Sequence, residues 1–584
     1  MPAEQKIDFE KIGQQSSKML ADFFGDHHSH MKTMSHVSQA FSQLAQQMMN
    51  DPERMVQMQL GLYQSYLALW ANMAEKMMGK EVEPLAEPQK GDRRFKAEAW
   101  EEHLIFDFIK QSYLLTADWM LNLINETEGL DEDTRQRVDF YTRQYIDALS
   151  PSNFPLTNPE VLQATVESKG QNLIDGLNNI IKDIERGEGK LKISMTDYEA
   201  FEVGKNLATT EGKVVFKNAL FELIHYTPKK QKVYERPLLI IPPWINKFYI
   251  LDLKPENSFV RFAVEECGLN VFLVSWKNPD ESYHDTTFED YLNTGLFTAV
   301  DTVLSITKQK DLNIIGYCIG GTLLASGLSV MAKKNDKRIN SATFFTTLID
   351  FSESGELKMF TDDHHYDLIM AKMEKQGYLD GAEMAQTFSM LRANDLIWSF
   401  VVNNYLLGKT PFPFDLLYWN DDSTRMPCAM HSYYLKNMYQ ENNLVKKDKL
   451  ELDGEKVDIT QIKQPLYMVT GVNDHIAPWE SCYKPIHKMQ AKEKRFILGR
   501  AGHVAGVINP PGNKKAFYWA GDAKAKDAST WHKQAEQHEG SWWLDWKKWI
   551  TQKSGKQVTA PKTLGSAKFK PLYSAPGKYV KEKS

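Results

Sequence analysis

The stretch "LNIIGYCIGGTLLASG", residues 312–327, is the strongest indication of the fold in this sequence. An apolar run ends at Gly316, Cys318 follows between Gly316 and Gly320, and a helix-like run of small and apolar residues begins. A strand, a sharp turn and a helix in this order are typical of a nucleophile elbow, whose glycines let strand and helix approach closely. We therefore predict an elbow with Cys318 in the place that serine usually takes.

This stretch has two other interpretations. A cysteine after a buried strand is often only a small core residue. The pair Gly320-Gly321 at a helix start could cradle a phosphate, but the lysine of a phosphate-binding loop is missing. The strand before Cys318 and the helix after it favour the elbow.

The sequence after about residue 215 has the rhythm of a parallel sheet. Six short apolar runs are expected to be strands: "LLIIP" (238–242), "VFLVSW" (271–276), "LNIIGY" (312–317), "ATFFTTL" (342–348), "PLYMVTG" (465–471) and "KRFILG" (494–499). Nearly continuous apolar strands with helical crossovers indicate a sheet covered on both faces. The gap of more than a hundred residues before 465 is too long for a crossover, so we predict an inserted cap at about 350–460. The expected fold is an α/β-hydrolase fold.

We predict four parts of the chain. They are a Met-rich helical segment (1–90), a helical N-terminal domain (91–205), the α/β-hydrolase catalytic domain with its cap (206–550) and a Lys-rich tail (551–584). The Met-rich segment is expected to pack on its own domain, or alternatively to dock a partner or a hydrophobic particle. The tail is expected to be mobile and solvated, with weak steering of anions as the alternative.

The composition argues against several classes of protein. The formal net charge of −6 is spread along 584 residues, so nothing indicates a nucleic-acid partner. The longest apolar runs are far shorter than the roughly 20 residues that span a bilayer, and we see no signal-peptide pattern. Four cysteines lie far apart without metal-ligand spacing, which indicates reduced thiols and a cytoplasmic location.

Two loops after predicted strands supply an acid and a base for the elbow. "VNDHIAPW", after the strand 465–471, contains Asp474, and "RAGHVAGVINPP", after the strand 494–499, contains His503. The order nucleophile, acid, histidine is that of α/β-hydrolases. We predict that Cys318 attacks, His503 takes its proton, and Asp474 holds the tautomer and the imidazolium.

Two competitors for these roles are present. Asp350 follows the strand before the cap, where some enzymes of this fold keep their acid, but strand order favours Asp474. His475 could be the base, but the loop of His503 would then have no role, so we expect His475 to support the acid loop.

The oxyanion hole of this fold uses the N–H after the nucleophile, here that of Ile319. The second N–H comes from the loop after an early strand. In "IPPWINKFYILDL" (241–253) the two prolines fix the turn and leave Trp244, Ile245 and Asn246 as candidate donors.

No metal site or cofactor is predicted. The following histidines and cysteines with candidate ligand atoms are expected to be solvated, surface or structural residues: His27, His28, His30, His36, His364, His365, Cys267, Cys428 and Cys482.

The chemistry of Cys318 favours a thioester substrate, because thiolate attack on a thioester yields an acyl-cysteine of similar reactivity. Acyl transfer from a carrier such as CoA is therefore expected, although cysteine hydrolases also occur on this fold.

With these residues in place, the chain resembles the class I polyhydroxyalkanoate synthases over roughly residues 92–550. The motifs that carry the resemblance are "DRRFKAEAW", "SPSNFPLTNPEVL", "PPWINKFYILDL", "FLVSWKNP", "GYCIGG", "LRANDLIWSFVVNNYLLG", "FDLLYWNDDSTRMPCAMHSYYL", "TGVNDHIAPW" and "AGHVAGVINPPG". The family's nucleophile, acid and base fall on Cys318, Asp474 and His503. Ala501 stands where the family commonly has serine, which leaves these three untouched.

The resemblance implies polymerisation of (R)-3-hydroxyacyl-CoA into polyester on cytoplasmic granules, with CoA as leaving group and no cofactor. It also implies a homodimer, with Trp419 of the "YWN" motif at dimer contacts, and residues 1–90 are a possible surface for granule-associated proteins. Two alternatives remain: a polyester depolymerase or thioesterase with the same three residues, and a non-catalytic granule scaffold.

Overall fold

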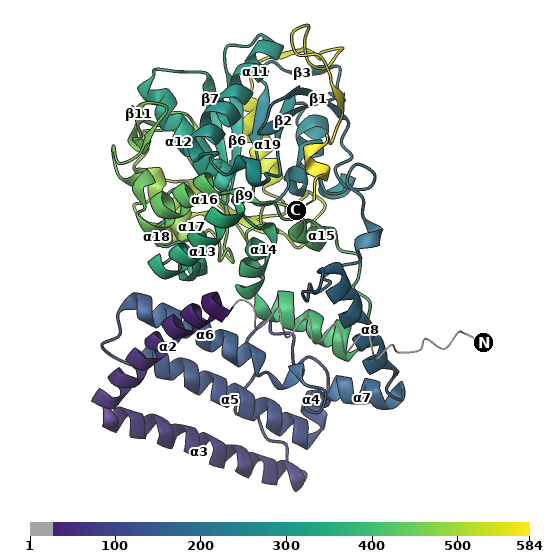
Figure 1. The fold of residues 1–584 in the computed structure, drawn as a ribbon, viewed down its shortest axis with the longest axis vertical. Helices are drawn as coiled ribbons and strands as arrows, with labels where there is room; N and C mark the ends of the chain where they lie inside the picture. Colours follow the sequence, from purple (N-terminus) through teal and green to yellow (C-terminus); the bar gives the residue numbers. More distant parts are fainter. Residues whose placement is uncertain (1–26, 584) are drawn as a thin grey trace, which may run out of the picture. The chain divides into compact units, whose positions relative to one another are not determined.

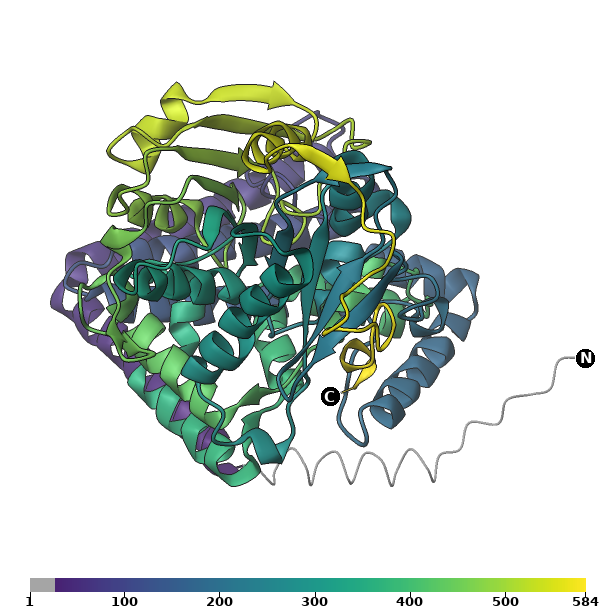
Figure 2. The ribbon, with the colours of Figure 1, turned by 90° about the horizontal axis from the view of Figure 1, so that it is seen from above.

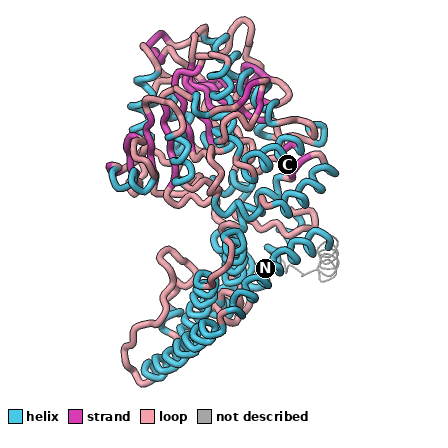
Figure 3. Tube along the Cα trace, turned by 90° about the vertical axis from the view of Figure 1, so that its left-hand side faces the viewer, coloured by secondary structure: helices cyan, strands magenta, loops and turns pink. Residues whose placement is uncertain are grey.

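The computed structural model describes residues 27–583, with side chains from residue 38 onward except that of His364. The chain divides into two compact units. The helical unit comprises residues up to Asp197 together with Phe388–Phe412, and the sheet unit comprises the rest. Figure 3 shows strands in the sheet unit, and the described residues of the helical unit contain none. In the described part of the chain, no helix has the length and apolar content to cross a bilayer.

The sheet unit is built on one sheet of eleven strands, in the order β15-β14-β13-β12-β7-β6-β4-β5-β2-β1-β17. Their bounds are β1 Gly212–Lys217, β2 Phe221–Tyr226, β4 Leu238–Ile241, β5 Val271–Trp276, β6 Leu312–Tyr317, β7 Ile339–Phe345, β12 Leu466–Gly471, β13 Lys494–Gly499, β14 Phe517–Asp522, β15 Glu536–Glu539 and β17 Tyr573–Ser574.

The six strands at the centre of the sheet, from β13 to β5, are parallel. They are the six runs that the sequence predicts, with ends that differ by three residues at most. The strands on both sides of them pair antiparallel. The predicted parallel sheet and the predicted α/β-hydrolase fold are thus both confirmed.

Alternate residues of the central strands enter two separate cores. On one face, Leu239, Ile314 and Phe344 pack with helices α11 (Thr298–Thr307) and α12 (Ile319–Lys333). On the other face, Ile240, Ile315 and Phe345 pack with the tryptophans at the start of α19 (Trp543–Lys553). Figure 2 shows helices on both sides of the strands. This two-sided burial is why the strands are apolar without interruption.

The C-terminal segment differs from the expected solvated tail. Residues 573–574 form β17 beside β1, and β16 (Gln557–Thr559) pairs with β3 (Lys232–Tyr234). The buried carboxylate of Glu222 accepts hydrogen bonds from the backbone N–H groups of Lys578 and Tyr579, at 2.8 and 3.2 Å. Apolar and hydrogen-bonding residues spaced among the lysines therefore fix this segment on the sheet unit, although its overall composition is that of a loop.

The segment between β7 and β12 contains the helices of the predicted cap. In the sheet unit these are α13 (Asp363–Gln376), α15 (Asp415–Asp421) and α16 (Cys428–Tyr434), and α14 (Gly381–Met390) runs up to the boundary. Residues Phe388–Phe412 pack instead with the helical unit. There, Asn394 Nδ2 donates to Asp147 Oδ1 at 2.6 Å and the Tyr405 hydroxyl to Asp183 Oδ2 at 2.7 Å. The insertion contributes to both units.

The helical unit consists of long helices and shorter ones that follow them (Figure 1). Their bounds are α2 His27–Asn50, α3 Pro52–Met77, α4 Ala99–Glu102, α5 Leu104–Glu126, α6 Glu132–Ala148, α7 Pro159–Glu167 and α8 Gln171–Arg186. Ala40 and Leu44 of α2 pack with Ile124 of α5 and Val138 of α6. The Met-rich region thus packs on its own unit with one face, as predicted. The residues before position 27 lie outside the described part.

Candidate active site

Cys318 stands at the turn between β6 and α12, as the sequence predicts. Its backbone has φ 52° and ψ −125°, a conformation that side chains rarely adopt and that is typical of a nucleophile elbow. The N–H of Cys318 donates to the carbonyl of Phe345 on β7 at 3.0 Å, which fixes the turn to the sheet. Cys318 is partly exposed, whereas the other three cysteines of the chain are buried. The elbow is therefore built around one accessible thiol.

The glycines of the elbow are required by close backbone contacts. A Cβ on Gly316 would lie 2.6 Å from the Cα of Gly321, and one on Gly320 would lie 2.5 Å from the carbonyl oxygen of Ile241. Real Cβ atoms do not approach other atoms so closely, so larger residues would push α12 away from β4 and β6.

His503 and Asp474 meet beside this turn. Nδ1 of His503 lies 2.8 Å from Oδ2 of Asp474. Oδ1 of Asp474 accepts hydrogen bonds from the N–H groups of Ile476 and Ala477, at 2.9 and 2.8 Å. Three nitrogen atoms thus fix the carboxylate, and the carboxylate fixes the imidazole ring. A ring held at Nδ1 presents Nε2 for proton exchange.

The imidazole of His503 favours its charged form. Burial lowers the pKa of His503, but the charges of Asp474 and Cys318 and hydrogen bonds to both raise it, and the balance is a pKa of about 10. At neutral pH the ring therefore favours its protonated form. The structure thus brings all three predicted residues together.

The oxyanion candidates lie next to the elbow. Ile319 is the first residue of α12, and the N–H groups at a helix start have no partner within the helix. The loop after β4 touches the elbow, because Gly320 packs on the carbonyls of Ile241 and Pro242. This loop carries the three candidate donors.

The three residues of that loop differ in their surroundings. The carbonyl of Ile245 accepts from the N–H of Thr424 at 3.0 Å, and Asn246 forms a β-bridge with Ser423. The indole of Trp244 is buried, with its ring 4.5 Å from that of Tyr291. Its side chain therefore belongs to the core. The assignment of the second N–H donor stays a prediction.

The two competing residues have other surroundings. Asp350 accepts hydrogen bonds from the N–H of Ser352 and from Nδ2 of Asn442, at 3.1 and 2.8 Å. These contacts hold a loop of the cap rather than an imidazole. His475 is half-buried, and its carbonyl oxygen lies against Gly355. Its supporting role stays a prediction.

Trp419 lies inside the sheet unit rather than on its surface. It is 5 % exposed, and its Nε1 donates to the carbonyl of Lys247 at 2.7 Å. In this conformation the indole fastens α15 to the loop after β4, so a direct contact with a second subunit would require the cap to move.

Two tyrosines of the cap reach the site and were not predicted. Tyr434 is buried, Tyr439 is half-buried, and the two are hydrogen-bonded to each other; Tyr434 also hydrogen-bonds to Thr322 of α12. Burial raises the pKa of both phenols, and the charge of Cys318 raises it further. Both lie in or just after the quoted motif "FDLLYWNDDSTRMPCAMHSYYL", but nothing in their spacing points to the thiol.

The fold and this grouping of thiol, imidazole and carboxylate define an enzyme of the α/β-hydrolase class. Two family models match the chain: the N-terminus of poly-beta-hydroxybutyrate polymerase over residues 91–263, and the α/β-hydrolase fold over residues 257–510.

Three relatives span nearly the whole chain. The poly(3-hydroxyalkanoate) polymerase of Methylorubrum extorquens is 44 % identical over 94 % of this chain and 90 % of its own. The polymerase subunit PhaC of Rhizobium meliloti is 42 % identical over 98 % and 93 %, and that of Cupriavidus necator 42 % over 91 % and 89 %. The chain belongs to the poly(3-hydroxyalkanoate) polymerase family and is class I-like. The family consists of acyltransferases, so the predicted resemblance is confirmed.

Proposed function

We propose that this chain polymerises (R)-3-hydroxyacyl-CoA through an acyl group on Cys318. The observation that carries the proposal is the accessible thiol on a strained elbow, hydrogen-bonded to His503, which is in turn fixed by Asp474. An imidazole hydrogen-bonded to a thiol can take its proton, and the thiolate so formed is the nucleophile.

The first half-reaction loads the enzyme. The Cys318 sulfur attacks the thioester carbonyl, the bond from that carbon to the CoA sulfur breaks, and the leaving thiolate takes the proton of His503. N–H groups at Ile319 and in the loop after β4 stabilise the oxyanion. The product is acyl-Cys318 beside a neutral imidazole, because His503 has given its proton to the CoA thiolate.

The second half-reaction makes the ester. The 3-hydroxyl of another acyl group attacks the acyl-cysteine, His503 takes the hydroxyl proton, and Cys318 leaves as a thiolate. The phenols of Tyr434 and Tyr439 offer hydrogen bonds for orienting that hydroxyl. Each round forms one ester bond and releases one CoA, and the starting imidazolium and thiolate are restored.

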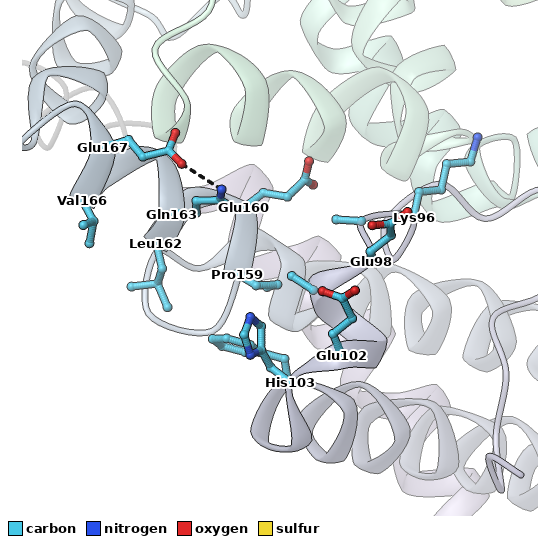
Figure 4. A pocket seen from close by; sticks show the side chains of 13 residues that line it. Lys96, Glu98, Glu102, His103, Pro159, Glu160, Leu162, Gln163, Val166 and Glu167 are labelled. Carbon is cyan, nitrogen blue, oxygen red and sulfur yellow. Dashed lines mark hydrogen bonds between the residues drawn. The ribbon is translucent and has the colours of Figure 1, made fainter. Parts of the chain in front are cut away.

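The helical unit contains a pocket of about 890 Å³ that does not suit CoA (Figure 4). It lies between the start of α5 and α7, with Phe106, Pro159 and Leu162 among its lining. Its lining contains one lysine and four acidic side chains, which are Glu98, Glu102, Glu160 and Glu167. The phosphates of CoA would be repelled there, so we place CoA elsewhere, at the site of Cys318.

The function is tested by incubating the purified chain with 3-hydroxybutyryl-CoA while free thiol and turbidity are recorded together. Polymerisation releases CoA thiol and produces turbidity in parallel. Thiol release without turbidity would identify a thioesterase, and no thiol release would identify a non-catalytic scaffold.

We also place the chain on polyester granules in the cytoplasm, with α3 as the contacting surface. One face of α3 packs on α5, where the Tyr66 hydroxyl lies 2.7 Å from Oγ1 of Thr116. The neighbouring face of α3 presents a stripe of apolar residues that are each more than half exposed: Val56, Leu60, Tyr63, Leu67, Trp70 and Met77. At its edge, the Trp70 ring also packs on Phe108 of α5, with 4.6 Å between ring centroids. Spacings of three, four and seven residues put them on one side of the helix. An apolar stripe of this length fits the apolar surface of a polyester, and granule-associated proteins are the alternative occupant.

Charging this stripe should separate binding from turnover. We expect Leu60→Glu with Leu67→Glu to lower the fraction of protein that sediments with isolated granules several-fold, while thiol release in solution is unchanged. The matched control is Gln57→Glu with Gln64→Glu, which adds the same charge on exposed residues about 60° around the helix from the two leucines. Equal loss in both double variants would show that charge alone, and not the stripe, governs binding.

The active form is proposed to be a homodimer whose cap opens over Cys318. The cap places Tyr434 and Tyr439 next to the thiol, so a growing polyester cannot leave while they stay there. Trp419 is buried when the cap is closed, and opening would expose it for contact with a second subunit. The same thiol-release assay should then show a lag at high dilution.

A further inference from the structure

Three residues distant in sequence meet at the edge of the cap. The ligand atoms of His284, Glu374 and Cys428 all lie within 4.8 Å of one another. His284 lies in the loop after β5, Glu374 near the end of α13, and Cys428 at the start of α16. None of the three has a role in the reaction proposed above.

Backbone contacts hold these segments together. The N–H of Cys428 donates to the carbonyl of Gly377, just after α13, at 3.1 Å, and the N–H of Ala429 donates to the carbonyl of His284 at 3.0 Å. The strands β8 (Tyr378–Leu379) and β9 (Met426–Pro427) pair directly beside them. The cluster is therefore positioned by the fold and does not depend on flexible side chains alone.

The side chains are arranged as ligands of one ion. Nδ1 of His284 lies 2.7 Å from Oδ1 of Asp285, which leaves Nε2 toward Glu374, 3.5 Å from its Oε2. A carboxylate on the far nitrogen of a metal-binding histidine is the usual way of orienting the ring. Bonds of about 2.0–2.2 Å to Zn²⁺ put two ligand atoms of a tetrahedron about 3.3–3.6 Å apart, which fits this separation.

The charge of the cluster also favours a cation. Glu374 and Asp285 are both acids, and in the described part of the chain the one ion pair of Glu374 is with His284. Cys428 is 2 % exposed, with its sulfur 4.0 Å from Oγ of Ser432. A divalent ion would replace the thiol proton, which passes to solvent, and would neutralise the carboxylates.

We propose that His284, Glu374 and Cys428 bind one zinc-class divalent cation, with a fourth position open to water. The mixture of thiolate, imidazole and carboxylate suits Zn²⁺ or Co²⁺, whereas Mg²⁺ and Ca²⁺ prefer oxygen ligands alone. Since Glu374 belongs to a cap helix and His284 to a loop of the sheet core, the bound ion clamps α13 to the core.

The test uses the full chain with Cys318→Ala, so that the reactive thiol cannot bind the metal. Co²⁺ is added to chelator-treated protein, and the sulfur-to-cobalt charge-transfer band is recorded. We expect a band that saturates at one equivalent and disappears when Zn²⁺ is added. Zn²⁺ should also slow hydrogen exchange in residues 363–376.

The variants assign the band to the cluster. Cys428→Ser should abolish it, His284→Gln and Glu374→Gln should each weaken binding by more than tenfold, and Cys482→Ser, which alters a buried thiol outside the cluster, should leave it unchanged. Asp285→Asn should weaken binding about tenfold, as expected for a residue that orients a ligand. A band that persists in Cys428→Ser, or no band in the parent, would overturn the proposal. His284 and Glu374 lie at the surface, so their variants keep the test decisive if Cys428→Ser does not fold.

Discussion

Replacing Cys318 with alanine is expected to lower CoA release by about 10⁴-fold or more, the size of loss seen when a nucleophile is removed from such a site. A methyl group cannot form the acyl-enzyme, yet it fits the elbow, because alanine keeps the Cβ and adds no atom. Thermal unfolding should therefore change little. Cys318→Ser should be nearly as inactive, because a hydroxyl is far less acidic than a thiol and leaves less readily once acylated.

Mass spectrometry after brief exposure to 3-hydroxybutyryl-CoA checks this assignment. The acyl group should be found on Cys318 in the unaltered chain and on no cysteine in Cys318→Ala. The buried cysteines serve as internal controls, because burial raises the pKa of Cys267 to about 12 and that of Cys428 and Cys482 above its ordinary value. An active Cys318→Ala with acyl groups elsewhere would place the chemistry on another residue.

Asp474→Asn should lower turnover by about 10³–10⁴-fold without unfolding the chain. The amide cannot stabilise the imidazolium, and it can hold the ring in the wrong tautomer. The charge of Asp474 contributes to the raised pKa of His503, so that pKa should fall in the variant. An NMR titration of the His503 ring measures this directly: the imidazolium of the unaltered chain should persist to about pH 10 and should lose its proton at lower pH in Asp474→Asn.

Asp350→Asn is the matched control, since Asp350 is the other acid that follows a central strand. It should leave turnover within a few-fold and the pKa of His503 unchanged, because its carboxylate holds Ser352 and Asn442. If Asp350→Asn were the more damaging change, the acid would be on β7 instead of β12.

The centre of the fold could be predicted because its signals are local. The six parallel strands are buried on both faces, so each is a short apolar run. Cys318, Asp474 and His503 each follow one of the strands β6, β12 and β13 within a few residues. Two of the strands outside this centre gave no such signal. β15 has the sequence "EQHE" and β17 has two residues, and both are strands only because a neighbour pairs with them.

Residues around the active site could be predicted only where they come directly after the nucleophile or after a strand in the sequence. Tyr434 and Tyr439 come from the cap, whose path over the sheet is not encoded in any short pattern. The cluster of His284, Glu374 and Cys428 was missed for a related reason: metal-ligand spacing is recognisable when ligands are neighbours in sequence, and these three come from separate segments. The Lys-rich tail was wrongly predicted to be solvated, because its average composition does not reveal the few residues that pair with β1 and β3.

The pairing of β17 with β1 has a consequence for how the chain is made. Lys213 and Ser574, which face each other across these strands, are 361 positions apart. On the ribosome the outer edge of β1 has no partner until those downstream residues have emerged. An open strand edge pairs readily with other chains, and contacts so distant in sequence form slowly. Newly made protein therefore passes through a period in which that edge is prone to aggregation. Slow expression, which lowers the concentration of unfinished chains, should favour recovery of the native fold.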